Sequence, residues 1–174
     1  MSLEDEIPKE FSVYKEGAIH KTTNSHVYIG QYQTQKAVLK IFPSKFPSEE
    51  TIRSYQKDYQ INALLHDKYP NEFCKPIKFK NEGTELFSVK SALGISLQKH
   101  QENQGKFKIE EFLKLGIQIC HSLHCVHEQN VLHCDIKPQN ILFDKEKDIC
   151  SIIDFESSFL VSLKNPSIQR NDRG

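Results

Sequence analysis

The segment from Val131 to Phe143 concentrates the polar side chains with the clearest capacity for chemistry. They stand between a helical pattern and the apolar run Ile141–Phe143, and they are His133, Asp135, Lys137 and Asn140. Carboxylate and amide oxygens suit a hard metal ion, and a lysine can neutralise anionic oxygens. Polar side chains flanked by apolar segments are drawn inward and need partners there. The pattern therefore predicts a polar loop held between packed elements.

A second carboxylate, Asp154, follows a short apolar run that is typical of a buried strand. It lies 19 residues after Asp135, and Phe155 and Glu156 come directly after it. An aspartate that closes a strand is usually only a turn residue, so this segment alone is a weak signal. The interval from the polar loop gives it weight.

Together these two segments resemble the catalytic loop H-R-D-x-x-x-x-N and the metal-binding D-F-G motif of protein kinases. Cys134 stands in the place of the arginine, and Glu156 in the place of the glycine. The spacing from Asp135 to Asn140 matches, and Lys137 followed by proline is similar to the loop of the serine/threonine class. Upstream, Ala37-Val-Leu-Lys40 resembles the V-A-I-K strand.

The resemblance implies transfer of a phosphoryl group from ATP to protein Ser/Thr hydroxyls, with Mg²⁺ as the metal. It assigns the acceptor proton to Asp135 and charge stabilisation to Lys137, and it gives His133 a supporting hydrogen-bonding role. Asn140 and Asp154 would hold Mg²⁺. Lys40 would contact the phosphates, and Asp58 on the following helix would fix its side chain. Because aspartate is one methylene shorter than glutamate, we expect a stretched Lys40–Asp58 ion pair.

The phosphate-binding end departs from the family pattern G-x-G-x-x-G-x-V. Aligning its valine with Val27 places His20, Thr22 and Ser25 where the three glycines belong. Glycine lets backbone amides approach phosphate without a Cβ, so these positions would need side-chain donors instead. The resemblance also assigns Val27 and Ala37 to the nucleotide site.

Other departures concern regulation and the adenine end of the site. The arginine that Cys134 replaces usually anchors a phosphorylated activation loop, so activity is expected not to need that phosphorylation. Lys90 and Ser91 stand near the hinge that contacts adenine. Glu156 adds a negative charge near the phosphates.

The elements that must position these residues predict an α+β, protein-kinase-like fold. A tail, 1–10, would precede a small β-rich N-lobe, 11–92, with strands at 27–31, 36–42, 73–80 and 86–89 and one helix, 48–66. A partial, mainly helical C-lobe, 93–174, would hold a long helix, 109–128, the catalytic loop, 131–140, and the metal-binding motif, 154–156. Its apolar stripe includes Phe112, Leu113, Gly116, Ile117, Cys120, Leu123 and Val126.

Length and composition narrow the class of protein. The chain has 174 residues, and its 23 Lys and Arg balance 23 Asp and Glu, which argues against nucleic acid or a membrane as the main partner. No apolar run approaches the roughly 18 residues of a membrane span. Five scattered cysteines, none in a C-x-x-C pair, indicate reduced thiols and a cytoplasmic protein.

Several alternatives stay open beside the kinase hypothesis. The first is a catalytically impaired, kinase-like binding or regulatory module, favoured by the missing glycines and by Glu156. A structural metal site in the run 120–127 and a Cys134–His133 nucleophile pair are weaker alternatives, because the helix and the loop already explain those residues. The stretches 22–28, 55–61 and 112–119 resemble the N-terminal kinase modules of large multidomain bacterial sensor proteins. Further domains or another chain would cover the incomplete C-lobe.

Overall fold

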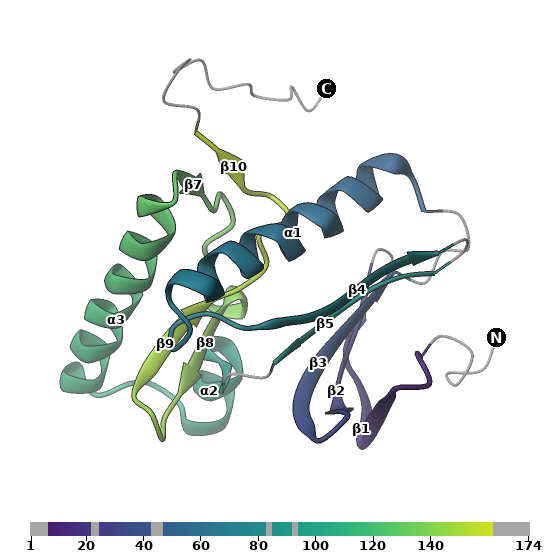
Figure 1. Cartoon of the computed structure of the whole chain (residues 1–174). Helices are drawn as coiled ribbons and strands as arrows, with labels where there is room; N and C mark the ends of the chain where they lie inside the picture. Colours follow the sequence, from purple (N-terminus) through teal and green to yellow (C-terminus); the bar gives the residue numbers. More distant parts are fainter. Residues whose placement is uncertain (1–6, 22–24, 43–46, 83–84, 92–93, 162–174) are drawn as a thin grey trace.

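The first half of the molecule is an antiparallel sheet with one helix beside it. The computed structural model describes residues 7–21, 25–42, 47–82, 85–91 and 94–161. The sheet has the order β1-β2-β3-β5-β4, and α1 (Glu49–Lys68) lies along β4 and β5 (Figure 1). Its strands are β1 (Phe11–Lys21), β2 (His26–Tyr32), β3 (Gln35–Phe42), β4 (Pro76–Glu82) and β5 (Glu85–Ser91).

The second half combines two helices with short strands. Its helices are α2 (Leu97–Gln104) and α3 (Ile109–Glu128), and a short 3-10 turn, η2 (Pro138–Asn140), precedes β8. Its strands are β6 (Ile95–Ser96), β7 (Val131–Leu132), β8 (Ile141–Asp144), β9 (Ile149–Ile152) and β10 (Phe159–Leu160). β6, β8 and β9 form one small sheet, and β7 pairs with β10. Figure 1 shows α3 and this sheet beside the end of α1. The α+β, kinase-like fold predicted from the sequence is confirmed.

Helix α1 is capped by Ser48, the first residue of the predicted helix 48–66. The Ser48 hydroxyl accepts a hydrogen bond from the Thr51 backbone amide at 3.1 Å, and Glu49 and Glu50 occupy the first turn. A side-chain cap and acidic residues both stabilise the free amides at a helix N-terminus. The inward face of α1 buries Tyr55, Asp58, Ile61, Asn62 and Leu65. This face therefore carries polar groups among apolar ones toward the rest of the molecule.

Alternation along β3 separates a core face from a site face. Ala37, Leu39 and Ile41 are buried in one apolar cluster with Tyr28 and Val89, among others. Successive side chains of a strand point to opposite faces, so Val38 and Lys40 face the other side. Lys40 therefore lies on the opposite face of β3 from Leu39 and Ile41.

A second apolar cluster joins the two halves. It consists of Ile61, Leu65, Phe73, Cys125, Val126, Val131, Ile152 and Phe155, which come from α1, α3, β7, β9 and the loops beside them. Burial of such side chains stabilises a fold by about 1.5–3 kcal/mol each. This cluster holds the residues that follow β9 against α1.

The apolar stripe predicted on α3 is mostly not its buried face. Phe112, Leu113 and Ile117 are 60%, 57% and 71% exposed, whereas Leu115, Ser122, Cys125 and Val126 are buried. α3 is apolar on more than one side, so hydrophobic periodicity alone could not tell which side packs against β9. The exposed row Ile109, Phe112, Leu113 and Ile117 is hereafter called the α3 apolar row.

Three other elements differ from the sequence-based expectation. β1 was not predicted as a strand because its pairing with β2 shifts register between Val13 and Ala18, which breaks the alternating pattern. α2 was not predicted because it buries only Leu97 and His100. The strand predicted at 73–80 begins instead at Pro76, since Phe73 and Cys74 are buried in the preceding loop.

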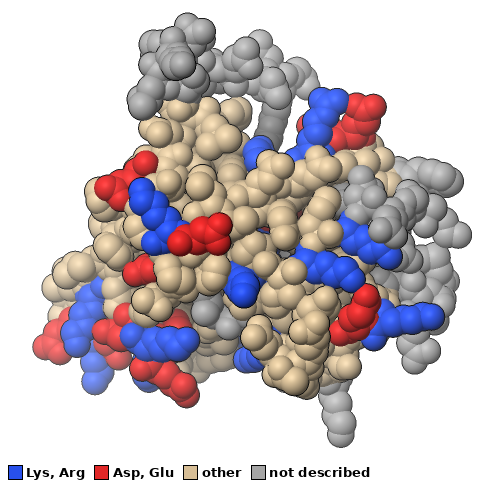
Figure 2. Space-filling model, viewed as in Figure 1, with Lys and Arg blue, Asp and Glu red and all other residues tan. Residues whose placement is uncertain are grey.

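Surface charge is mixed on the face shown in Figure 2, where basic and acidic side chains lie interspersed and neither sign forms one continuous patch. Across the described ranges, none of the helices has both the length and the apolar character needed to cross a bilayer.

Candidate active site

His133 supports the loop that follows β7. Its Nδ1 accepts a hydrogen bond from the Asp135 backbone amide at 3.2 Å, so its Nε2 carries the proton that is donated to the Ile153 carbonyl at 2.9 Å. Its ring also packs edge-on against Phe155, with the centroids 4.9 Å apart. The supporting role predicted for His133 agrees with these contacts. The chain turns at Cys134, between His133 and Asp135. This residue is exposed and has a φ of 63°.

Asp135, Lys137 and Asn140 form a compact group around one carboxylate. Lys137 Nζ lies 2.6 Å from Asp135 Oδ2, and Asn140 Nδ2 donates to the same oxygen at 3.0 Å and to the Asp135 carbonyl at 3.0 Å. The Lys137 contact, followed by that of Asn140, lowers the pKa of Asp135 below its usual value. The carboxylate is therefore ionised at neutral pH and half-exposed toward solvent.

Asp154 is joined to this loop through the backbone. The Ile153 amide donates to the Asn140 carbonyl at 2.9 Å, which sets the residue before Asp154 beside η2. Asp154 has a φ of 70°, a left-handed conformation that aspartate tolerates better than most residues. This turn takes its carboxylate out of the line of β9 and toward β3.

Lys40 meets two carboxylates from this segment. Its Nζ lies 3.2 Å from Asp154 Oδ1 and 2.6 Å from Glu156 Oε1, and it sits 5.5 Å from the centre of the Tyr55 ring. Burial alone would lower the pKa of Lys40, but the charges of Asp154 and Glu156 outweigh burial and raise it. Lys40 therefore remains charged, and it links the sheet to the end of β9.

The ion pair predicted between Lys40 and Asp58 is corrected by the structure. Asp58 pairs instead with Lys90 of β5, and its Oδ1 accepts from the Phe155 amide and from Asn62 Nδ2, both at 2.9 Å. Burial tends to raise the pKa of Asp58, but the charges of Lys90 and then Lys40 hold it below its usual value. Asp58 is thus a buried, ionised anchor for the segment after β9, and Lys90 is its cation.

The sequence pattern contained only part of this arrangement. The sequence places Lys90 near the hinge but does not predict its pairing with Asp58. The signal lies in the register, because Lys90 is the cross-strand partner of Val38 and so shares the face of Lys40. That register becomes known only once the sheet order is known.

Some of the residues assigned to the phosphate end lie near Lys40, and others do not or fall outside the described residues. Val27 is the cross-strand partner of Lys40 and shares its face, and the backbone of His20 pairs with Val27. Ser25 lies directly before β2, and Thr22 is outside the described residues. The assignment of Ala37 to the nucleotide site is wrong, because Ala37 is fully buried in the core on the opposite face of β3 from Lys40. Val38, not Ala37, shares the face of Lys40.

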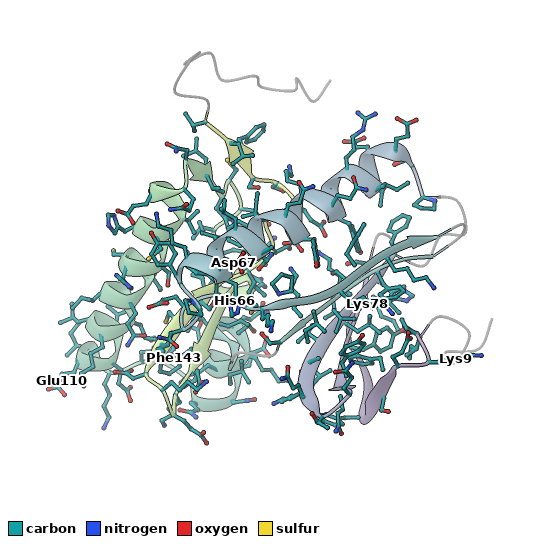
Figure 3. All side chains as sticks on the ribbon, viewed as in Figure 1. Lys9, His66, Asp67, Lys78, Glu110 and Phe143 are labelled. Atoms are coloured by element: carbon teal, nitrogen blue, oxygen red, sulfur yellow. The ribbon has the colours of Figure 1, made fainter. Side chains whose placement is uncertain are left out.

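The cysteines and histidines of α3 form few contacts with one another. Cys125 Sγ lies 3.9 Å from His121 Nε2, and all five cysteines are free thiols. Within the part of the chain that the structure describes, no three His, Cys, Asp or Glu side chains are grouped so as to hold a metal ion. His66, labelled in Figure 3, lies at the end of α1 with its Nδ1 3.0 Å from the Phe73 carbonyl, so it serves the packing of that end.

Fold and site together define a protein-kinase-like molecule, and comparison with known proteins agrees. Residues 15–171 match the family described as protein kinase domain, and the chain belongs to that family. It is 25% identical over 155 residues to the serine/threonine-protein kinase mos of Patiria pectinifera, which covers 88% of this chain and 43% of that protein.

Two further relatives are also serine/threonine kinases. STY17 of Arabidopsis thaliana is 26% identical over 74% of this chain and 22% of its own length. Serine/threonine-protein kinase 36 of Pongo abelii is 31% identical over 68% of this chain and 9% of its own length. The chain thus spans less than half the length of the curated relatives it matches.

Proposed function

We propose that this chain transfers a phosphoryl group from ATP to Ser or Thr hydroxyls of a protein substrate. The observation that carries the proposal is the contact between Lys40 and Asp154, which are 114 residues apart in the sequence and 3.2 Å apart in space. It brings a phosphate-binding cation and a metal-binding carboxylate to one point, next to the Asp135 loop. The membership of the protein kinase family and the serine/threonine kinases among its relatives support the same reaction.

Each residue of the loop has a role that follows from its contacts. Asp135 would accept or orient the proton of the substrate hydroxyl, because it is ionised and half-exposed. Lys137 would stabilise negative charge on the transferred group, since its ammonium already lies beside that carboxylate. The Asn140 amide holds Asp135 through its nitrogen, which orients the carboxylate before a substrate arrives.

The donor set fits Mg²⁺ and a phosphate. Because Asn140 donates through Nδ2, its Oδ1 is the atom available to a metal, and the partly exposed Asp154 carboxylate supplies a second oxygen. Mg²⁺ with ATP would supply the phosphoryl group and neutralise its charge. Lys40 would bind the phosphates, and Val27 and Val38 would supply apolar contacts on the same sheet face. His20, Thr22 and Ser25 remain candidates to donate hydrogen bonds to the phosphates.

The proposal also includes two lobes, a partner that covers part of the second lobe, and a cytoplasmic location. Residues 11–92 would act as one lobe and 93–174 as part of a second, and further polypeptide would cover the α3 apolar row. The size of that row, with Ile109 and Ile117 70% and 71% exposed, supports a covering partner. Five free thiols support a cytoplasmic location.

The test is γ-phosphate transfer from radiolabelled ATP with Mg²⁺ to a generic basic protein substrate, comparing the wild type with Asp135→Asn. We expect a loss of about 10²–10⁴-fold in rate. Glu146→Gln, an exposed carboxylate in the turn between β8 and β9, is the matched control and should keep the wild-type rate. Equal transfer by Asp135→Asn and the wild type would reject the assignment.

A second candidate, a nucleotide-binding or regulatory module without turnover, is favoured by one observation. Glu156 places a carboxylate 2.6 Å from Lys40, near where phosphates would bind. In that case a thermal-shift titration with Mg²⁺ and ATP would stabilise the protein, but no Asp135-dependent transfer would occur.

A further inference from the structure

We propose that Glu156 is the positioning residue for Lys40. The sequence assigns this role to Asp58 of α1, but Asp58 forms its ion pair with Lys90 instead. The inference rests on the proposed function only for the phosphate-binding role of Lys40. The ion pairs themselves are seen in the structure. Two lysines and three carboxylates take part: Lys40, Lys90, Asp58, Asp154 and Glu156.

Asp58 already has three hydrogen-bond donors on its carboxylate, and none of them is Lys40. Its Oδ2 receives Lys90, and its Oδ1 receives both the Phe155 amide and Asn62 Nδ2 at 2.9 Å. Its side chain is 2% exposed, and that of Lys90 is 13% exposed. This buried carboxylate is therefore bonded to three elements at once, α1, β5 and the segment after β9. Moving it to Lys40 would leave a buried ammonium on β5 without a partner, which is costly.

The register of β3 against β5 places Lys40 and Lys90 close to each other. Lys40 pairs with Ser88 and Lys90 with Val38, so the two lysines are diagonal neighbours on one face of adjacent strands. Like charges at that separation repel in a partly buried setting. Different carboxylates for the two ammonium groups relieve the repulsion, and the structure has Lys90 on Asp58 and Lys40 on Asp154 and Glu156.

Glu156 is suited to this part by length and position. It stands where the family motif has glycine, which has no side chain, so the contact exists only because of this substitution. Its carboxylate approaches Lys40 more closely, at 2.6 Å, than that of Asp154, at 3.2 Å. If Asp154 turns to a metal ion, Glu156 is the carboxylate that stays on Lys40 and keeps its ammonium beside the phosphate site.

The first experiment measures partner choice without any nucleotide. Urea unfolding is followed for Lys40→Met, Glu156→Gln, Asp58→Asn and Lys90→Met, and for the double variants Lys40/Glu156, Lys40/Asp58 and Lys90/Asp58. We expect the Lys40/Glu156 and Lys90/Asp58 pairs to deviate from additivity by about fivefold or more in the unfolding constant. Lys40 and Asp58, which interact through their charges without a direct contact, should deviate from additivity less than either of these pairs.

Coupling of Lys40 to Asp58 that equals or exceeds its coupling to Glu156 would overturn the proposal. Glu156→Gly, which restores the residue of the family motif, provides a second variant for the same cycle if Glu156→Gln folds poorly. Lys99→Met and Glu146→Gln, exposed residues on α2 and in the β8–β9 turn, are the charge-matched controls. This experiment decides the pairing even if the chain transfers no phosphate.

The second experiment asks whether Glu156 acts through Lys40. The dissociation constant for ATP with Mg²⁺ is measured by titration calorimetry for Glu156→Gln in the wild-type and in the Lys40→Met background. We expect Glu156→Gln to raise this constant severalfold when Lys40 is present and not to raise it when Lys40 is absent. An equal increase in both backgrounds would mean a general structural effect and would reject the positioning role.

Discussion

Two charged clusters lie next to each other in this molecule, and they are built in opposite ways. In the loop, Lys137 and Asn140 reach Asp135 from two and five residues away, and the Lys137 and Asp135 side chains are 45% and 35% exposed. Around Lys40 and Asp58 the partners lie 32, 97 and 114 residues apart, and Asp58 is buried. One cluster is local and open, whereas the other is long-range and closed.

The difference suggests that the first cluster serves the reaction and the second stabilises the fold. Exposed ion pairs contribute little to folding, so the Asp135 cluster is free to serve a reaction. The Asp58 cluster joins the sheet, α1 and the segment after β9, and its unpaired charges would be costly. We therefore expect substitutions of the exposed Asp135 and Lys137 to reduce transfer with little effect on stability, and substitutions around Asp58 to reduce stability first.

Asp58→Ala should have the largest effect on stability. It leaves the Lys90 ammonium and the Phe155 amide buried without partners, and breaking a buried pair in this way costs about 3–5 kcal/mol. The free energy of unfolding in urea is the measurement. Adding Lys90→Met should recover much of the loss, because an apolar pair replaces the lone charge. A cost below about 1 kcal/mol for Asp58→Ala would remove the contrast between the clusters.

Acid should weaken the Asp58 cluster selectively. The pKa of Asp58 is lowered on folding, so the unfolded chain binds its proton first as the pH falls. The contribution of Asp58 is fully present above its unfolded pKa, near 4, and is lost as the pH falls through the lower folded value. Stability measured between neutral pH and about pH 3 should therefore fall less steeply in Asp58→Asn than in the wild type. Parallel curves would show that Asp58 does not contribute in this way.

His133→Ala should have an intermediate effect, because this residue belongs to the loop by sequence but to the interior by burial. It is 2% exposed and makes hydrogen bonds to the Ile153 carbonyl and the Asp135 amide. Their loss, together with a cavity beside Phe155, should cost about 1–3 kcal/mol. Thermal unfolding would measure it. An effect as small as that of an exposed loop residue would place His133 outside the interior.

Lys137→Met should have the smallest effect on stability, below about 1 kcal/mol, because its pair with Asp135 is exposed. Phosphoryl transfer should fall by about a hundredfold, since a preorganised cation is lost from the developing charge. Unfolding and transfer are measured on the same preparation, with Lys145→Met, an exposed lysine in the β8–β9 turn, as the control. A stability loss as large as that of Asp58→Ala would erase the distinction between the clusters.

The contacts within the loop are local in the sequence, and this has a physical consequence for what can be predicted. The contacts of His133, Asp135, Lys137 and Asn140 with one another span at most five residues, so their spacing nearly determines which of them can meet. The Ser48 cap and the alternation of β3 are local in the same sense. The apolar side of α3 that packs inward was not predictable, since that depends on where β9 lies.

The amino-acid sequence by itself determined the α+β kinase fold and which polar residues share the loop 131–140. Only the tertiary structure decided which carboxylate each lysine holds, that Ala37 belongs to the core, and which face of α3 is covered. Asp58 could have paired with either lysine on the grounds of charge alone. The register of β3 against β5 and the burial of Asp58 made the choice, because an ion pair depends on distance and desolvation, neither of which can be read from order along the chain.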